Sequence, residues 1–91
     1  MRGAKVLYKK LGRLLREGRE RQKMSLKDAA LVLGLTNEHY LWRCEDARWA
    51  NFPAAKLRRA LDLYKIPPAD AVAAMSEDFR AGMLAFLKAK Q

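Results

Sequence analysis

The sequence predicts an all-α domain, and three observations support this prediction. Apolar residues recur at three- and four-residue steps along most of the chain, which is the spacing of one face of an α-helix. No segment alternates apolar and polar residues as a half-buried strand does. The chain has 91 residues, of which 51% are apolar, enough for a small core and one compact domain. A barrel or a doubly wound sheet would need far more chain.

The first two predicted helices are separated by a clear capping signal. The first begins at about Ala4 or Leu11 and ends at about Gln22, with basic residues opposite its apolar face. Ser25 is suited to cap the second helix because its hydroxyl can accept a bond from a backbone N–H, and an acidic residue, Asp28, follows three residues later. Gly34 is expected to end this helix because glycine adopts the left-handed conformation at little cost.

The remaining helices are delimited by polar caps and prolines. Thr36 or Asn37 is expected to cap a third helix that runs to about residue 46, and residues 48–52 are expected to form a loop. Pro53 suits the opening of a fourth helix, which ends before the Ile66-Pro67-Pro68 run because proline disfavours helix in the residue that precedes it. Pro68 can open a fifth helix through Met75, and the Ser76-Glu77-Asp78 run is expected to cap an additional C-terminal helix over 79–88.

The short helices on either side of Gly34 predict a helix-turn-helix, in which one helix braces the DNA backbone and the next lies in the major groove. Three motifs strengthen this prediction. Residues 11–19 (LGRLLREGR) match L-G-x-x-L/I-R-x-x-R. Residues 24–36 (MSLKDAALVLGLT) correspond to L-S-x-x-x-x-A-x-x-L-G-V/Y-S, with Met24, Leu35 and Thr36 in place of L, V/Y and S. The third motif, E-R-G-x-x-x-P, corresponds to Glu45-Asp46-Ala47 followed by Phe52-Pro53. By these motifs residues 11–66 resemble the Xre/Cro/cI-type helix-turn-helix family.

The resemblance implies a λ-repressor-like five-helix fold, to which the additional C-terminal helix would be appended. The expected division is a basic extension over 1–10, the helix-turn-helix domain over 11–75 and an amphipathic helix over 76–91. The family's ion pair between the first helix and the end of the third corresponds to Arg19 and Glu45, the alternative being two solvated surface charges. The chain departs from the family pattern at Leu26, where many members have glutamine, at Asp46, where arginine is usual, and at Ala47, where glycine is usual.

The resemblance also indicates which residues would contact DNA. On the third helix, Tyr40, Leu41 and Cys44 are expected to face inward. The expected base contacts are Glu38, His39, Trp42 and Arg43, of which Arg43 can pair bidentately with guanine. The expected backbone contacts are Ser25, Lys27, Asn37, Arg48, Lys9, Lys10 and Arg13. The alternative for each set is a solvated helix face.

The charge of the chain favours a polyanionic partner or an acidic membrane surface, since 19 basic and 10 acidic residues give a net charge of +9. Residues 1–23 carry +7 of this charge, whereas residues 36–46 carry −2. We expect double-stranded DNA as the partner and an intracellular, cytoplasmic and nucleoid-associated protein, because no segment has the apolar length of a signal peptide or a membrane span. The residues from Arg2 to Lys10 could also enter a minor groove.

Apolar residues outside the helix-turn-helix leave two interpretations open. Phe79, Met83, Phe86 and Leu87 form a stripe that either covers the domain's own core or forms the interface of a homodimer, and Val6 and Leu7 pose the same question. Trp49 either packs in the core or anchors a partner. We expect no enzyme, cofactor or metal: His39 has no neighbours at metal-ligand spacing, Cys44 is suited to a core and there is no glycine-rich phosphate loop.

Two functions therefore follow from the sequence. The first is a DNA-binding transcriptional regulator that uses the third helix, at about 37–46, as its reading element. The alternative is a helix-turn-helix scaffold for protein–protein interaction, with weak or no sequence-specific DNA binding, and an antitoxin would combine both roles. Leu26, Glu38 and Asp46 favour the alternative, whereas Arg43 and the basic N-terminal third favour the regulator. A non-specific architectural DNA-binding protein is a third interpretation.

Overall fold

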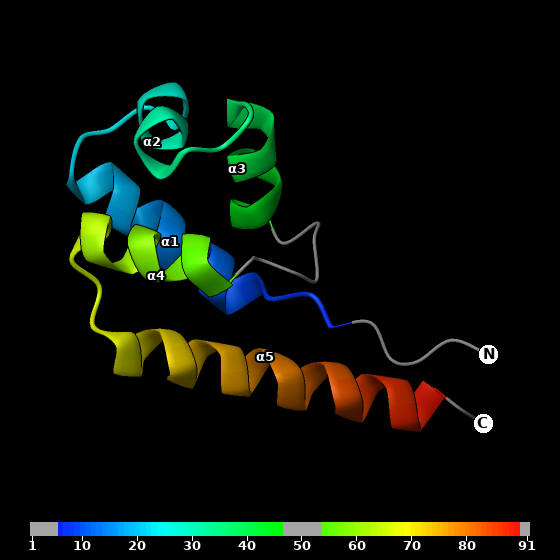
Figure 1. The fold of residues 1–91 in the computed structure, drawn as a ribbon. Helices are drawn as coiled ribbons and strands as arrows, with labels where there is room; N and C mark the ends of the chain where they lie inside the picture. Colours follow the sequence, from blue (N-terminus) through cyan, green and yellow to red (C-terminus); the bar gives the residue numbers. More distant parts are fainter. Residues whose placement is uncertain (1–5, 47–53, 90–91) are drawn as a thin grey trace.

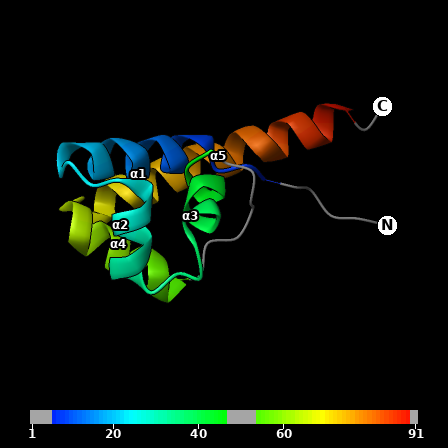
Figure 2. The ribbon, with the colours of Figure 1, turned by 90° about the horizontal axis from the view of Figure 1, so that it is seen from above.

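The structure is a computed structural model that describes residues 6–46 and 54–89. These residues form five α-helices: α1 (Lys9–Arg21), α2 (Leu26–Leu33), α3 (Glu38–Glu45), α4 (Ala54–Tyr64) and α5 (Pro68–Ala89). The helices lie in three layers, with α2 and α3 on one side, α1 and α4 in the middle and α5 on the other side (Figure 1). Seen from above, α2 runs at a steep angle to α1, and the far half of α5 extends beyond the other helices (Figure 2). The prediction of an all-α domain is confirmed.

The core lies between the five helices, where α1 packs against α3, α4 and α5, and α2 packs against α3 and α4. Its largest fully buried side chains are Leu15 of α1, Leu33 of α2, Leu41 of α3 and Tyr64 of α4. Ala71 contributes the only buried apolar side chain of α5 among the residues described. Burial of a leucine-sized side chain contributes about 1.5–3 kcal/mol to stability. The four side chains from α1, α2, α3 and α4 therefore hold these helices together.

Three of the helices end in the same way, with one residue in the left-handed conformation. These residues are Lys23 after α1, Gly34 after α2 and Lys65 after α4, with φ angles of 56°, 70° and 59°. At Gly34 the expected glycine C-cap is confirmed, because the Leu35 N–H donates to the Ala30 carbonyl at 2.9 Å and so closes a Schellman motif. The two lysines adopt the same backbone without the freedom of glycine, and the sequence signal that marks Gly34 is missing there.

The expected boundary between a fifth helix and an additional C-terminal helix is wrong. Pro68 does open α5, as expected, but the helix then continues through Ser76, Glu77 and Asp78 to Ala89. Asp78 caps a different helix: its carboxylate accepts the backbone N–H of Lys10 at 3.0 Å and that of Leu11 at 3.1 Å. A carboxylate at this place satisfies free N–H groups at the start of α1 and complements the helix dipole. The Ser76-Glu77-Asp78 run has the composition of a helix start, but the carboxylate of Asp78 caps α1.

The cap from Asp78 predicts a loss of stability on its removal. Replacing Asp78 by alanine is expected to lower the free energy of unfolding by about 1–2 kcal/mol, because two N–H groups of α1 lose their acceptor. Glu77→Ala is the matched control, since Glu77 makes only an exposed ion pair with Lys10 Nζ at 3.2 Å, worth roughly 0–1 kcal/mol. Urea unfolding followed by circular dichroism measures both variants. Equal losses in the two variants would show that Asp78 does not cap α1.

The expected loop over 48–52 and the expected helix opening at Pro53 lie outside the described residues, as do Ala47 and Trp49. The start of the first helix is described: residues 6–8 are not helical and α1 begins at Lys9, between the two expected starts.

Candidate nucleic-acid interface

Two short helices joined by a tight turn form one edge of the molecule. Ser25 caps α2 by accepting the Asp28 N–H at 3.0 Å, and Asn37 caps α3 by accepting the Tyr40 N–H at 3.0 Å. Between them Gly34 reverses the chain in the left-handed conformation. Of the two expected caps for the third helix, Asn37 rather than Thr36 takes the role. These local bonds fix where α3 begins and how it leaves α2.

An ion pair fixes the other end of α3 to α1. The Arg19 guanidinium donates to both Glu45 carboxylate oxygens, at 2.8 and 3.1 Å, and also donates to the carbonyl oxygen of Met24 at 2.8 Å. The side chains are 11% and 4% exposed, so solvent screens the pair little. The hydrogen bonds that Arg19 donates to Glu45 raise the pKa of Arg19 further above its already high value, although burial opposes this shift. α3 is therefore held at both ends, which makes it a rigid element.

The backbones of α1 and α3 also approach closely at Gly12. A Cβ atom at this position would lie 2.5 Å from the carbonyl oxygen of Glu45 and 3.0 Å from that of Cys44. Only a glycine leaves room for the last turn of α3 at this distance. Burial raises the pKa of the Cys44 thiol to about 11, so the side chain is a neutral part of the core at neutral pH.

The outer face of α3 carries the expected base contacts. Glu38 and His39 are exposed, Trp42 is 38% exposed and Arg43 is half-buried. Leu41 and Cys44 face inward as expected, whereas Tyr40 is only half-buried. His39 connects its neighbours, since its ring stacks on Trp42 with centroids 5.5 Å apart and its Nε2 accepts a hydrogen bond from Arg43 Nε at 3.2 Å. The outer face of α3 thus carries the guanidinium of Arg43, the stacked rings of His39 and Trp42 and the carboxylate of Glu38.

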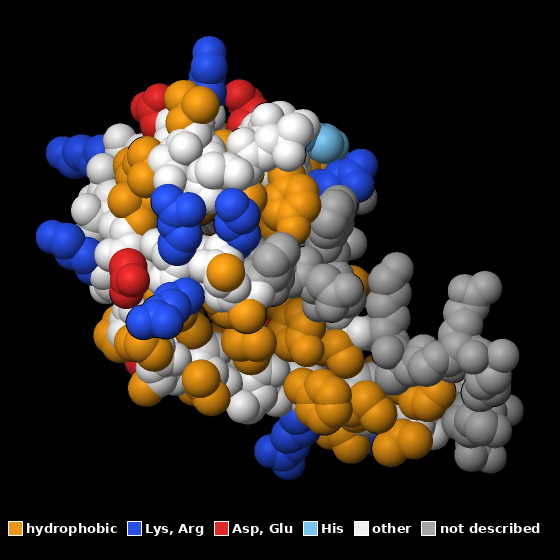
Figure 3. Space-filling view, viewed as in Figure 1, with side chains coloured by type: hydrophobic (Ala, Val, Ile, Leu, Met, Phe, Trp, Pro, Cys, Tyr) orange, Lys and Arg blue, Asp and Glu red, His pale blue; other side chains and the backbone are white. Residues whose placement is uncertain are grey.

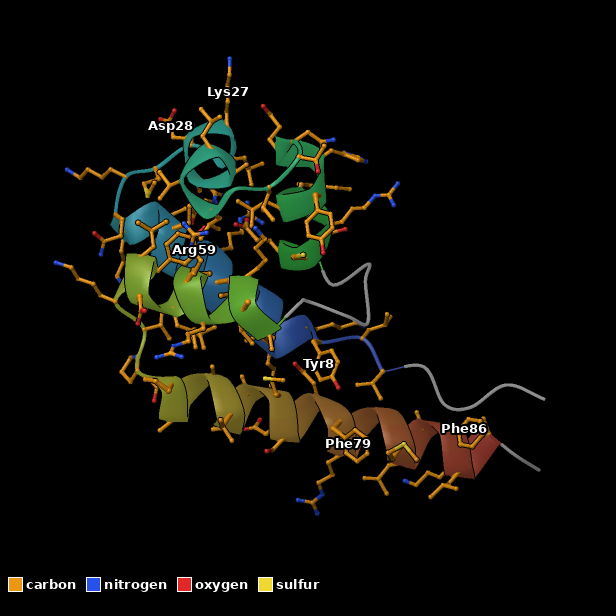
Figure 4. The ribbon with its side chains drawn as sticks, viewed as in Figure 1. Tyr8, Lys27, Asp28, Arg59, Phe79 and Phe86 are labelled. Carbon is orange, nitrogen blue, oxygen red and sulfur yellow. The ribbon has the colours of Figure 1, made fainter. Side chains whose placement is uncertain are left out.

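The structure separates the expected backbone contacts into two groups. Ser25, Lys27 and Asn37 lie on the α2–α3 edge, where the Lys27 side chain points away from the domain (Figure 4). Lys9, Lys10 and Arg13 lie at the start of α1, next to α5. Lys10 is engaged there with Glu77 of α5, in the layer opposite α2 and α3. Arg48 lies outside the described residues.

Three basic residues that the sequence argument did not single out lie close to α2 or α3. Arg16 lines a recess of about 110 Å³ together with Leu26 and Trp42. Its place three residues before Arg19, on the same helical face, was a usable signal. Lys56 and Arg59 of α4 donate to the carbonyl oxygens at the end of α2, at 3.1–3.2 Å, where cations complement the helix dipole. Figure 4 labels Arg59. No local pattern could indicate this long-range contact.

The charge on the α2–α3 edge is less acidic than the sequence suggests. Residues 36–46 carry a formal charge of −2, but Glu45 is buried and compensated by Arg19. The other charged side chains of α3 and its caps are Glu38 and Asp46, which are exposed, and Arg43, which is half-buried. The repulsion of a phosphate backbone by this edge is correspondingly smaller.

The C-terminal stripe does not cover the core. Phe79 and Leu87 are 53% and 58% exposed, and Met83 and Phe86 are half-buried. Val6 instead packs against α5, where a Cβ at Gly82 would lie 3.2 Å from it, and Leu7 stays 39% exposed. An apolar surface consequently runs along the far half of α5 (Figure 3).

A capped α2, a left-handed turn and a rigid α3 with a polar outer face define a helix-turn-helix domain. Among the described residues, no helix is long and apolar enough to cross a bilayer. The family model of the helix-turn-helix domain matches residues 10–74, so the chain belongs to this family, in agreement with the resemblance to Xre-type members. Domains of this family are typically not enzymes. No curated protein and no solved structure matches the chain.

Proposed function

We propose that the protein is a DNA-binding transcriptional regulator that places α3 in the major groove of duplex DNA. The observation that carries this proposal is the rigid placement of α3, which is capped by Asn37 at its start and tied to α1 by the Arg19–Glu45 pair at its end. A B-DNA major groove admits one α-helix whose outer side chains reach the base edges. Because the reading element is fixed before binding, little ordering is needed on contact.

The residues around α3 fit this placement. Arg43 is the candidate for the most specific contact, a bidentate pair with guanine, and Glu38 can accept from cytosine N4. Lys27, with the backbone N–H groups at the start of α2, is the candidate for phosphate contacts on the same edge. The basic residues at the start of α1 lie beside α5, so we assign them to long-range attraction of the DNA rather than to direct contact. A regulator of this kind acts on the nucleoid, in the cytoplasm.

Selection of bound duplexes from a random library tests the proposal. At two salt concentrations, the native protein is expected to enrich one motif, and Arg43→Ala is expected to weaken specific binding by about 1–3 kcal/mol. Arg80→Ala is the matched control, because it removes the same charge from the exposed surface of α5 and should leave the motif unchanged. Uniform binding with steep salt dependence would reduce the function to backbone attraction, and no binding at low salt would refute it.

The apolar surface of α5 favours a second proposal, a homodimer that pairs two α5 helices. Phe79, Leu84 and Leu87 are each about half exposed, which corresponds to about 300 Å² of apolar surface in total, comparable to the largest apolar patch of a typical monomer, which is often functional. Acidic residues lie in the first half of α5 (Asp70, Glu77) and basic ones in the second (Arg80, Lys88). An antiparallel pair would therefore align opposite charges, and its two-fold axis would relate two α3 helices.

Sedimentation equilibrium tests the dimer directly. The native chain is expected to have twice the monomer mass at micromolar concentration, and Phe79→Glu combined with Leu87→Glu should yield monomers. Leu31→Glu is the control, since Leu31 is 70% exposed on α2, away from α5. A native chain that is monomeric would refute the homodimer and leave the surface to a different protein, as the scaffold interpretation requires.

A further inference from the structure

A groove of about 480 Å³ lies between the chain at the start of α1 and the far half of α5. Its apolar lining consists of Leu7 on one side and of Ala81, Gly82, Ala85 and Phe86 on the other. Small-molecule sites have volumes of roughly 300–1,000 Å³ and are mostly apolar, with a few polar groups that orient the ligand. The groove therefore has the size and the lining of a site for a small ligand.

Small side chains on α5 leave room for this groove. Asp78, Gly82 and Ala85 follow one another at four- and three-residue steps, so they share the side of α5 that faces α1. Val6 covers this side at Gly82, where a Cβ atom would lie 3.2 Å from it, and Val6 is itself buried. Ala85, one turn further, is exposed. The far half of α5 extends beyond the other helices (Figure 2), and its inner side there forms one wall of the groove.

Lys9 supplies a cation at the groove that is available to an anionic ligand. It is exposed and, among the described residues, pairs with no acidic side chain, whereas Lys10 pairs with Glu77 at 3.2 Å. Asp78, the other charged residue of the lining, is 6% exposed, and its carboxylate already accepts the N–H groups of Lys10 and Leu11. The dipole of α1 offsets part of the charge of Asp78.

The two ends of the groove differ in chemistry. The chain before α1 runs antiparallel to α5, because the N–H groups at the start of α1 meet Asp78 whereas Val6 meets Gly82. Lys9 accordingly lies toward the Asp78 end of the groove. Phe86 lies eight residues further along α5, which corresponds to about 12 Å of helix. A ligand that fits both ends has one charged group and an extended apolar body.

We propose that the groove binds a small amphipathic carboxylate, such as a medium-chain fatty acid, with its apolar chain along Gly82 and Ala85 and its carboxylate at Lys9. Burial of the chain drives association, and the ion pair adds a preference for an anion over a neutral ligand. The site is independent of the proposed DNA binding, because α5 lies in the layer opposite α2 and α3 (Figure 1). A ligand bound there contacts both α5 and the start of α1 without covering the α2–α3 edge.

Titration of the full chain with octanoate, followed by ¹⁵N NMR, tests the site. The amide signals of Gly82 and Ala85 are expected to shift saturably, with a dissociation constant of roughly 1 mM for a ligand of this size. Ala85→Leu fills the groove from an exposed helical position and should weaken binding about tenfold. Leu87→Ala is the matched control, because residue 87 lies about 200° further round α5 and its change should leave the affinity unaltered.

Octan-1-ol separates the contribution of the charge from that of burial. Lys9→Gln removes the cation from an exposed position, so it should weaken octanoate binding about two- to fivefold and leave octanol binding unchanged. Arg80→Gln is the matched control, since it removes an exposed cation of α5 that does not line the groove, and it should affect neither ligand. Equal effects of Lys9→Gln on both ligands would overturn the assignment of the carboxylate to Lys9.

Two other results would overturn the site as a whole. Shifts that do not saturate and that concentrate at the exposed side chains of Phe79 and Leu87 would show non-specific adsorption of the ligand. Equal binding of the native chain and Ala85→Leu to phosphatidylglycerol vesicles, without any response to octanoate, would assign the apolar surface to a membrane. Neither result bears on the selection of DNA duplexes, so the proposed function would stand if this inference failed.

Discussion

Replacing Glu45 by alanine is expected to lower the free energy of unfolding by about 3–5 kcal/mol, the largest loss expected for a single side chain of this protein. The substitution leaves the Arg19 guanidinium 11% exposed, with the Met24 carbonyl oxygen as its remaining hydrogen-bond acceptor. A buried charge without a counter-charge is costly because the interior solvates it poorly. The end of α3 would lose its tie to α1 at the same time.

The exposed pair on the same helix provides the matched control. Arg16 and Glu20 are 3.3 Å apart, but their side chains are 64% and 55% exposed, so Glu20→Ala should cost less than about 1 kcal/mol. Thermal unfolding followed by circular dichroism measures both. Charge reversal extends the test: Glu45→Arg should lower the melting temperature, and Arg19→Glu added to it should restore part of the loss. Additive losses in the double variant would show that the two side chains do not stabilise each other.

Gly12→Ala is expected to lower the free energy of unfolding by about 3 kcal/mol, although alanine favours a helix more than glycine does. At an open helical position the same change should add up to about 1 kcal/mol of stability. Here the new methyl would lie 2.5 Å from the carbonyl oxygen of Glu45, and a backbone atom cannot move aside alone. The last turn of α3 would have to shift away from α1.

A second glycine in a helix allows a matched comparison. At Gly82 the new methyl would meet only the Val6 side chain, at 3.2 Å, so Gly82→Ala should be nearly neutral in urea unfolding. Because α3 moves, Gly12→Ala should also weaken specific DNA binding under conditions where the variant is folded. Stabilisation of the Gly12 variant would mean that α1 and α3 do not approach closely.

Most helix boundaries could be predicted because their signals are local. Ser25 and Gly34 bracket α2, and Pro67 and Pro68 separate α4 from α5, as the neighbouring residues alone indicate. The continuity of α5 could not be predicted in this way. Asp78 resembles a local cap, and only the tertiary fold shows that its carboxylate serves the start of α1.

The candidate site was predictable only where a family pattern or a helical face supplied the information. The Arg19–Glu45 contact, between residues 26 positions apart, came from the resemblance and not from periodicity. The spacing of four residues indicates that His39 and Arg43 are neighbours on α3, but it does not indicate that Nε2 of His39 is the acceptor. Lys10 was predicted to contact DNA because of its charge. Its ion pair with Glu77 could not be predicted, because that pair depends on where α5 packs against α1.

The cap that Asp78 provides also bears on the order in which the chain can fold. The two N–H groups at the start of α1 find their acceptor 67 and 68 residues later, in the last helix. Contacts at such separation close a long loop and form late, because the chain entropy must be lost before they stabilise anything. While the polypeptide is being synthesised from its N-terminus, the first turn of α1 therefore remains incomplete until α5 has emerged and docked. The start of α1 is thus completed by α5, from the other end of the part of the chain that the structure describes.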